Sequence, residues 1–177
     1  SWSQHTCREI SKLVNEFSKE LLVSKKVVLN CGAGGNDYGI SRDHTCINLD
    51  ITDRKIKNTK KSVVGDMEML PFEEESIDAI LCVGASINYT DPILVLNEFH
   101  RVLGRGGVAL IDFESSGSAE VRLKDRNKSV SVIERSFAGR HDKQYVFSEK
   151  FILNSLRSIG FSIVKSVRYH TSSSIWA

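Results

Sequence analysis

Short, continuous runs of apolar residues alternate along the chain with segments whose apolar residues recur at helical spacing. A run without polar alternation is typical of a strand that is buried on both faces, as strands of a parallel sheet are. Strands that alternate with helices indicate an α/β fold. The runs that we interpret as strands cover residues 27–31, 46–50, 62–64, 77–84 and 108–113.

Three other segments space their apolar residues as amphipathic helices do, and they cover residues 5–22, 92–103 and 149–159. Asp91 and Pro92 are residue types preferred at the N-cap and the first helical position, so they predict the start of the second helix. The glycines at 104, 106 and 107 are predicted to end it before the fifth strand. Its buried face is predicted to consist of Ile93, Leu94, Leu96, Phe99, Val102 and Leu103.

The connection after the first strand is short for an α/β fold. Residues 36–43 are polar and contain a glycine, which predicts a loop or at most a turn or two of helix. Residues 51–61 are basic and irregular, which is compatible with a short helix or a loop. Residues 161–169 and 171–176 are predicted to be two final strands, joined tightly enough to be antiparallel.

Residues 115–147 break the rhythm of strands and helices. Polar and apolar residues alternate over 129–132, Gly139 suits a bend, and 145–147 is again apolar, so we predict a β-hairpin or an irregular lid. A chain of 177 residues fits one domain. We therefore expect a single domain over 1–177, with 115–147 as an insertion that covers the substrate, because loops on the ligand side often do so.

Clustered glycines follow the first strand. Gly32 and Gly34 have no Cβ, so a ligand can approach the backbone closely there. Asp50 ends the second strand at close to the ~20-residue spacing that separates a glycine turn from a ribose-binding carboxylate. Because ligands bind beyond the carboxyl ends of the strands in open α/β sheets, the two features together predict a nucleoside-containing ligand. An ordinary turn, with Asp50 as a turn residue or helix N-cap, is the alternative.

Composition narrows the class of protein. Hydrophobic residues at 41% and charged residues at 26% are typical of a soluble globular protein, and no apolar run reaches the length of a membrane span. The net charge of +2 argues against a strongly basic nucleic-acid binder. Residues 115–177 hold 11 Lys and Arg against 5 Asp and Glu. This excess could favour an anionic substrate, and a solvated surface is the alternative.

The cysteines and the first 20 residues give a prediction of the cellular location. Cys7, Cys31, Cys46 and Cys82 form no CxxC pair, so we interpret them as small buried residues in a reducing compartment and expect no metal site. Residues 1–20 carry charge throughout and lack the apolar core of a signal peptide. The expected location is the cytoplasm.

Five blocks stand in the order typical of one family. They cover residues 28–34, 48–51, 65–72, 76–78 and 98–107, and they read VLNCGAG, NLDI, GDMEMLPF, SID and EFHRVLGRGG. On these blocks the chain resembles the class I S-adenosylmethionine-dependent methyltransferases, from about residue 27 to the C-terminus. A set of five ordered motifs is far more specific than one glycine turn.

The resemblance implies the fold, the cofactor and its contacts. The fold is a Rossmann-like α/β fold with a seven-stranded, mostly parallel sheet, an antiparallel final strand and helices on both faces. The cofactor is S-adenosylmethionine. The implied cofactor-binding residues are Asn30, Gly32, Ala33 and Gly34 at the methionine part, Asp50 and Ile51 at the ribose, Asp66 and Met67 at the adenine, and Val83, Gly84 and Ala85 near the transferred methyl group.

The chain also departs from the family pattern. Asn30 stands where an acidic residue is usual, and Asn36 stands where a later glycine is usual. Asn88 occupies the position after the fourth strand that is often histidine. From their location we predict that Asn88 and Tyr89 position the acceptor. Further candidates for this role are Tyr38, Ser86, His141 and Tyr145.

The functional prediction is methyl transfer to an unidentified acceptor. We expect a small molecule, and the basic residues 122–140 favour an anionic one, while a nucleic-acid or protein acceptor stays open. A catalytically inactive, cofactor-binding partner or regulatory subunit is the main alternative. An NAD-dependent oxidoreductase is disfavoured, because Asp37 would repel a pyrophosphate at a helix N-terminus. The oligomeric state stays open.

Overall fold

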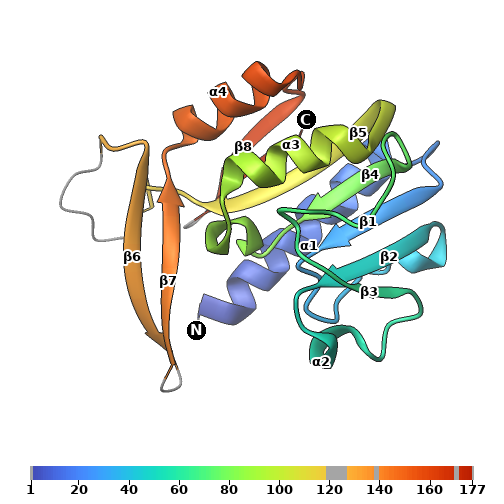
Figure 1. Cartoon of the computed structure of the whole chain (residues 1–177), viewed down its shortest axis with the longest axis horizontal. Helices are drawn as coiled ribbons and strands as arrows, with labels where there is room; N and C mark the ends of the chain where they lie inside the picture. The colour runs from blue at the N-terminus through green and yellow to red at the C-terminus, as the bar shows by residue number, and fades with distance from the viewer. Residues whose placement is uncertain (1, 119–126, 138–139, 170–171, 177) are drawn as a thin grey trace.

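Seven strands form one twisted sheet in the computed structural model, which describes residues 2–118, 127–137, 140–169 and 172–176 (Figure 1). The strand order is β3-β2-β1-β4-β5-β9-β8. All pairings from β3 to β5 are parallel, and β9 runs antiparallel to both of its neighbours, which confirms the predicted sheet. The strands are β1 (Val27–Cys31), β2 (Thr45–Asp50), β3 (Ser62–Val64), β4 (Ile77–Cys82), β5 (Leu103–Glu114), β8 (Lys165–Tyr169) and β9 (Ser172–Trp176).

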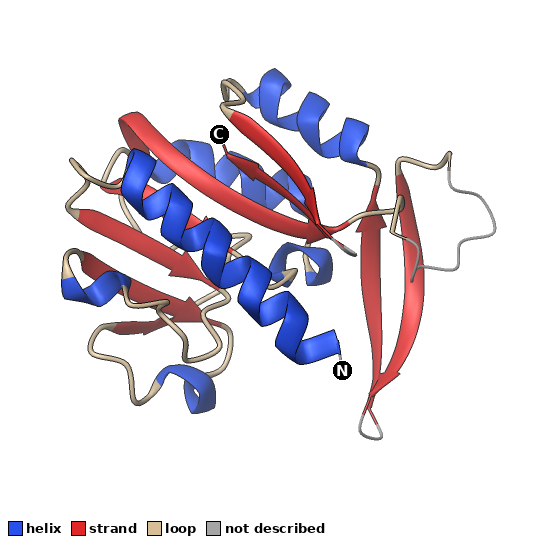
Figure 2. Ribbon diagram, turned by 180° about the vertical axis from the view of Figure 1, so that it is seen from behind, coloured by secondary structure: helices blue, strands red, loops and turns tan. Residues whose placement is uncertain are grey.

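Helices cover both faces of the sheet, as Figures 1 and 2 show from opposite sides. On one face, α3 and α4 bury Phe99, Ile152 and Leu156. On the other face α1 buries Phe17, whose ring lies edge-on to Trp176 of β9 at 5.6 Å between ring centroids. The helices are α1 (Trp2–Leu21), α2 (Asp53–Ile56), α3 (Pro92–Val102) and α4 (Glu149–Ile159), with 3₁₀ turns η1 (Ile40–Arg42) and η2 (Ser86–Tyr89).

The strand order places a switch point between β1 and β4. The chain leaves β1 toward β2 on one side and leaves β4 toward β5 on the other. Ligands bind beyond the carboxyl ends of the strands at such a point, because the two departing loops leave a crevice between them. A ligand site is therefore expected between the loops that follow β1 and β4.

A separate two-stranded hairpin projects from the sheet (Figure 1). Its strands are β6 (Val130–Phe137) and β7 (Arg140–Phe147), which pair antiparallel over their full length. This confirms the predicted hairpin, while Gly139, which was predicted to form its bend, lies outside the described residues. The carbonyl of Phe147 accepts the N–H of Ser116 at 2.8 Å and so ties β7 to the end of β5.

The start of α3 and the strand after it differ from the prediction. Asp91 does cap the helix, because its Oδ1 accepts the N–H of Ile93 at 2.9 Å. Ile93 and Leu94, however, are 39% and 49% exposed, and Pro92 and Val95 are buried instead. Pro92 and Val95 precede Phe99 by seven and four positions, so all three lie on one face of the helix. Ile93 and Leu94 lie to the side of that face.

β5 begins at Leu103, directly after α3, so the three glycines lie inside this strand rather than before it. Leu103 pairs with Ile77, but the next register pair joins Val108 to Ala79. Residues 104–107 are thus a bulge in β5, and Gly106 has the positive φ (+69°) that such an irregularity needs.

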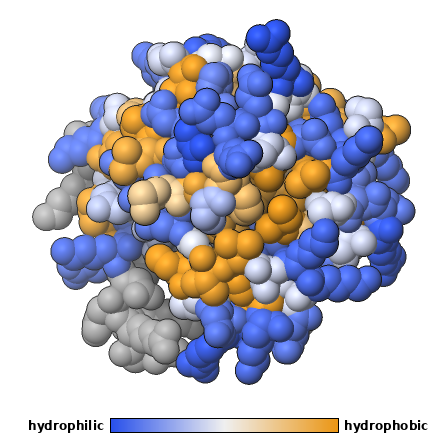
Figure 3. Space-filling view, turned by 45° about the vertical axis from the view of Figure 1, so that its right-hand side comes forward, coloured by the Kyte–Doolittle hydropathy of each residue, from blue (hydrophilic) through white to orange (hydrophobic). Residues whose placement is uncertain are grey.

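Three of the cysteines are buried as predicted, whereas Cys7 on α1 is exposed. Burial raises the pKa of Cys82 to about 12, so this thiol is unreactive at neutral pH. Large apolar side chains also reach the surface, and Figure 3 shows apolar residues gathered across the middle of one face. No helix among the described residues has the length and hydropathy needed to cross a bilayer.

An ion pair fixes the loop between β3 and β4. Arg101 donates from Nε and Nη2 to the two oxygens of Glu98, both at 2.7 Å. Glu98 Oε2 also accepts the N–H of Leu70, and the Arg101 guanidinium donates to the carbonyls of Leu70 and Phe72. The pair therefore replaces the missing backbone partners of this loop and holds it against α3.

Replacing Glu98 by Gln should lower the free energy of unfolding at pH 7 by about 1.5–3 kcal/mol, the contribution of hydrogen bonds to a charged group. The hydrogen bond from Arg101 lowers the pKa of Glu98. Such a carboxyl stabilises the fold above its unfolded pKa, and the contribution is lost as the pH falls through the folded pKa. In urea denaturation, the gap between the Glu98→Gln variant and the wild type should therefore narrow steadily as the pH falls below the unfolded pKa of about 4.3. The exposed Glu73→Gln is the control, and a gap that stays constant would contradict the assignment.

Candidate functional site

A cavity of about 420 Å³ opens at the switch point. This volume is in the range of sites for small ligands and cofactors, about 300–1,000 Å³. Its walls come from the loops that follow β1, β2, β3 and β4 and from η2. The lining residues are Gly32, Tyr38, Leu49, Asp50, Ile51, Lys55, Gly65, Asp66, Met67, Val83, Gly84, Ser86, Tyr89 and Thr90.

The glycine turn brings bare backbone to the cavity. Gly32 has φ +64°, and a Cβ built there would lie 2.3 Å from Ser86 Oγ. The turn is held to β2, because Ala33 donates its N–H to the carbonyl of Leu49 at 3.1 Å. Only glycine can therefore stand at position 32 while the turn and η2 keep this approach.

Asp50 is fixed in place at the base of the cavity. Its Oδ2 accepts the N–H of Gly34 at 3.1 Å, and its Oδ1 accepts both the N–H and the hydroxyl of Thr52 at 3.1 Å. The residue is only 5% exposed, and yet it lines the cavity. A carboxylate that is oriented in this way before binding can accept hydrogen bonds from a diol without reorganising.

The wall beyond Asp50 combines apolar and acidic groups. Ile51 is 71% exposed, which is unusual for a large aliphatic residue, and Met67 lines the same cavity from the loop after β3. Asp66 lies beside them, exposed, with Oδ1 accepting the N–H of Glu68 at 2.9 Å. Two apolar side chains and a carboxylate are suited to a flat heteroaromatic ring that carries an amino group.

The turn after β4 is unusual in its backbone. Gly84 and Ala85 both have positive φ, +78° and +59°. Both N–H groups point at one oxygen, because Asp112 Oδ2 accepts them at 2.9 Å and 3.2 Å. The sequence analysis did not single out Asp112. The signal was present, because an acidic residue within the otherwise apolar run 108–113 indicates a buried carboxylate that needs hydrogen-bond donors.

Tyr38 reaches over the cavity from the loop after β1. Its φ of +52° is rare for a residue with a side chain, and the Oδ1 atoms of Asn36 and Asp37 accept the next N–H groups of this loop, at 3.0 and 2.9 Å. Burial, and next the negative charge of Asp112, raise the pKa of Tyr38 to about 12. The phenol is therefore a neutral hydrogen-bonding group at physiological pH.

The structure separates the two predicted acceptor-positioning residues. Tyr89 is 55% exposed and lines the cavity. Asn88 is fully buried and does not line it. The Asn88 amide donates to the carbonyls of Glu114 at 3.0 Å and Tyr145 at 2.6 Å, and its oxygen accepts the N–H of Glu114 at 2.9 Å. The geometry therefore gives no support to Asn88 as a catalytic residue, because its polar atoms already join η2, β5 and β7.

Four of the predicted cofactor residues also lie behind the cavity wall: Asn30, Ala33, Gly34 and Ala85. Asn30 is buried, and its Nδ2 donates to the carbonyl of Asn36 and to Asn48 Oδ1. It thus ties the glycine loop to β2 and has no contact with the cavity. The other seven predicted residues line it, together with Lys55 and Thr90, which the sequence analysis did not single out. His141, another residue predicted as a candidate for positioning the acceptor, has a side chain that the structure does not describe.

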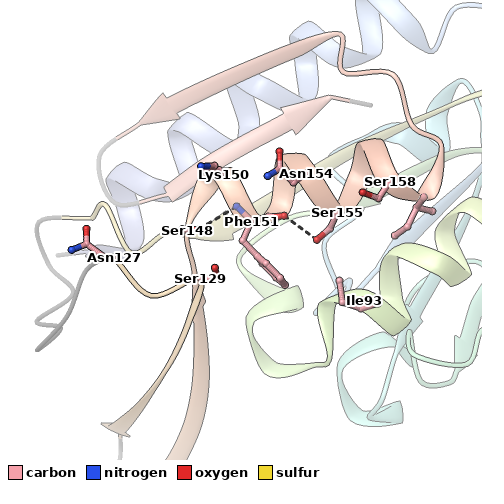
Figure 4. A pocket seen from close by; sticks show the side chains of 10 residues that line it. Ile93, Asn127, Ser129, Ser148, Lys150, Phe151, Asn154, Ser155 and Ser158 are labelled. Carbon is pink, nitrogen blue, oxygen red and sulfur yellow. Dashed lines mark hydrogen bonds between the residues drawn. The ribbon is translucent and has the colours of Figure 1, made fainter.

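A second cavity of about 470 Å³ lies beside the N-terminus of α4 (Figure 4). Serine and asparagine side chains dominate its lining, and Figure 4 shows that two of these serines are used within the helix. Ser148 Oγ accepts the N–H of Phe151 at 3.1 Å, and Ser155 Oγ donates to the Phe151 carbonyl at 2.9 Å. The cavity at the switch point is therefore the better candidate for chemistry.

Together, the doubly wound sheet and the nucleoside-type cavity at its switch point define a Rossmann-like ligand-binding domain. Residues 28–111 match the model of the family described as a methyltransferase domain. The strand order above and the structural relatives below agree with this match in fold, so the chain is similar to the class I S-adenosylmethionine-dependent methyltransferases.

One similar protein is the malonyl-[acyl-carrier protein] O-methyltransferase of Hamiltonella defensa, which is 29% identical over 134 residues. The match covers 67% of this chain and 51% of that protein, so the chain spans about half the length of this relative. The PH0226 protein of Pyrococcus horikoshii OT3 has a similar fold (TM-score 0.75, 20% identity, 98% of this chain and 91% of that one). An S-adenosylmethionine-dependent methyltransferase of Clostridium acetobutylicum gives a TM-score of 0.73 at 14% identity, over 94% and 89%.

Substituting Gly32 by Ala should destabilise the protein by about 2–4 kcal/mol, because the Cβ adds a clash with Ser86 to the cost of a positive φ. The free energy of unfolding in urea measures this. Gly106→Ala is the matched control, since Gly106 has a similar φ of +69° with nothing within 4 Å of the added Cβ. The difference between the two variants isolates the clash, and equal effects would mean that the glycine turn does not approach η2 as described.

Proposed function

We propose that this protein transfers a methyl group from S-adenosylmethionine to a small-molecule acceptor. The observation that carries the proposal is the oriented carboxylate of Asp50, which lines the cavity beside the glycine turn. Gly32 beneath the methionine part, Asp50 at the ribose diol, and Asp66 with Ile51 and Met67 around the adenine would hold the cofactor.

The shortness of the segment after β1 supports this cofactor over a dinucleotide. A pyrophosphate is usually bound at the N-terminus of a helix, where free N–H groups and the helix dipole favour an anion. Here that segment holds only the three-residue turn Ile40–Arg42. The Ser41 hydrogen bond lowers the pKa of Asp37, so the loop also carries a negative charge. S-adenosylmethionine has no phosphate and needs no such helix.

The cofactor supplies an electrophilic methyl group on a sulfonium, and the chain orients the partners for in-line attack. The Gly84–Ala85 turn lies on the cavity side expected to face that methyl group. Tyr38 and Tyr89 line the same cavity and are the candidates for positioning the acceptor. Because its pKa is raised, Tyr38 would act as a hydrogen-bond donor rather than as a general base.

The hairpin β6–β7 is the element that we assign to the acceptor. Its Tyr145 carbonyl is bonded to Asn88 of η2, so the hairpin stands beside the cavity-lining end of η2. The basic residues that suggested an anionic acceptor belong to this part of the chain, and Lys128 is exposed. The structure does not describe residues 122–126 or the side chains of Arg135 and Arg140. A carboxylate-bearing acceptor would also agree with the name of the Hamiltonella relative.

Calorimetric titration with S-adenosylmethionine, S-adenosylhomocysteine and NADH tests the cofactor. Saturable binding of the first two without the third is the expected result. Turnover of the methyl donor with a panel of small carboxylic acids and amines then separates an enzyme from an inactive, cofactor-binding subunit, because that alternative binds the cofactor without consuming it.

The Asp50→Ala variant should bind S-adenosylmethionine about 1–3 kcal/mol more weakly than the wild type, the loss expected for hydrogen bonds to a charged group. Titration calorimetry measures the change. Asp53→Ala is the control, because Asp53 is exposed at the start of α2 and does not line the cavity. Equal affinities of wild type and Asp50→Ala would show that the ribose does not lie at Asp50.

A further inference from the structure

Asp112 stands out among the buried charged residues, because no cofactor motif includes it and yet it holds part of the cavity wall. It is 1% exposed and lies near the carboxyl end of β5. Its Oδ2 accepts the two successive N–H groups of Gly84 and Ala85. Successive N–H groups that converge in this way form a small anion site in the backbone, and here the carboxylate of the protein fills it.

This contact stabilises a backbone that is costly. A residue other than glycine at positive φ costs about 1–3 kcal/mol and persists only where the surroundings determine it. Ala85 is such a residue, with φ +59°, and it directly follows Gly84, which lines the cavity. Asp112 therefore sets the shape of the wall that is expected to face the transferred methyl group.

The Asp112 carboxylate lies directly behind the cavity wall, because it accepts the N–H of the cavity-lining Gly84 at 2.9 Å. Burial, and next the charge of Asp112, raise the pKa of Tyr38, a cavity-lining residue from the loop after β1. The same two causes raise the pKa of Cys82, at the end of β4. A buried charge acts through a low local dielectric, so its effect on a nearby ligand charge is larger than it would be in water.

We propose that Asp112 is a positioning residue that holds the Gly84–Ala85 turn and makes the site prefer a cationic ligand to a neutral one. The inference rests on the proposed function. S-adenosylmethionine carries a sulfonium charge, whereas the product S-adenosylhomocysteine is a neutral thioether at that atom. The carboxylate thus favours the methyl donor and assists release of the product.

The variant Asp112→Asn separates charge from shape. Both N–H groups bond to one oxygen, so the amide oxygen of an asparagine can keep both bonds while the charge is lost. Asp78→Asn is the matched control, because Asp78 Oδ2 likewise accepts two successive N–H groups, those of Lys26 and Val27 at the start of β1, and does not line the cavity.

The experiment is titration calorimetry of the three proteins with S-adenosylmethionine, S-adenosylhomocysteine and sinefungin, in which a charged amine replaces the methylsulfonium. Asp112→Asn should bind the two cationic ligands about tenfold more weakly and leave S-adenosylhomocysteine within about twofold. Tenfold is the order of one interaction between unit charges about 10 Å apart at an effective dielectric constant of about 20. Asp78→Asn should leave all three affinities unchanged.

Equal weakening of all three ligands by Asp112→Asn, or no change in any, would overturn the preference for cations. If Asp112→Asn does not fold, the wild type still provides a test, because S-adenosylhomocysteine binding more tightly than both cationic ligands would contradict the inference. A wild type that binds none of the three would overturn the proposed function itself, and this inference with it.

Discussion

The site depends on buried carboxylates that accept backbone N–H groups where the chain leaves a strand. Asp50 holds the glycine turn after β1, and Asp112 holds the Gly84–Ala85 turn after β4. Each lies in the strand beside the turn that it holds, so parallel pairing alone brings acid and turn together. Without these carboxylates the buried N–H groups of the turns would lack hydrogen-bond partners, and this loss would destabilise the turns. The two acids therefore determine the shape of both walls at the switch point.

Side-chain hydrogen bonds to the backbone also hold the other loops of the cavity. The Glu98–Arg101 pair supplies partners for the loop that carries Asp66 and Met67, and so connects α3 to the cavity at the switch point. The loop after β1 has no full helix and instead keeps Tyr38 at a positive φ through side-chain bonds. These loops keep their conformation through polar contacts together with packing, since Leu70 and Ile40 are buried in the two core clusters.

Most of the fold could be predicted from the sequence, because apolar runs and motif order carry that information locally. The predicted strands and helices all occur, and seven of the predicted cofactor residues line one cavity. Two predicted asparagines do not line it, and the reason is the same for both. Asn88 and Asn30 stand at motif positions, but whether an amide faces a cavity or a backbone carbonyl depends on distant residues such as Glu114 and Asn48. Asp112 was missed for the same reason, since its partners lie 27 and 28 residues away.

The cavity and the hairpin belong to different parts of the chain. The family match ends at residue 111, within β5, and the hairpin assigned to the acceptor lies beyond it. Asn88 of η2 donates to the carbonyl of Tyr145 and so joins the matched part to the hairpin. The end of β5 also bonds to β7, because Ser116 donates to the Phe147 carbonyl and Gln144 donates to Glu114. Because these contacts use backbone carbonyls or buried amides, the solvent-facing residues of the hairpin can vary without disturbing them. The cavity at the switch point and the hairpin beside it are therefore built from separate stretches of the chain and joined through buried contacts.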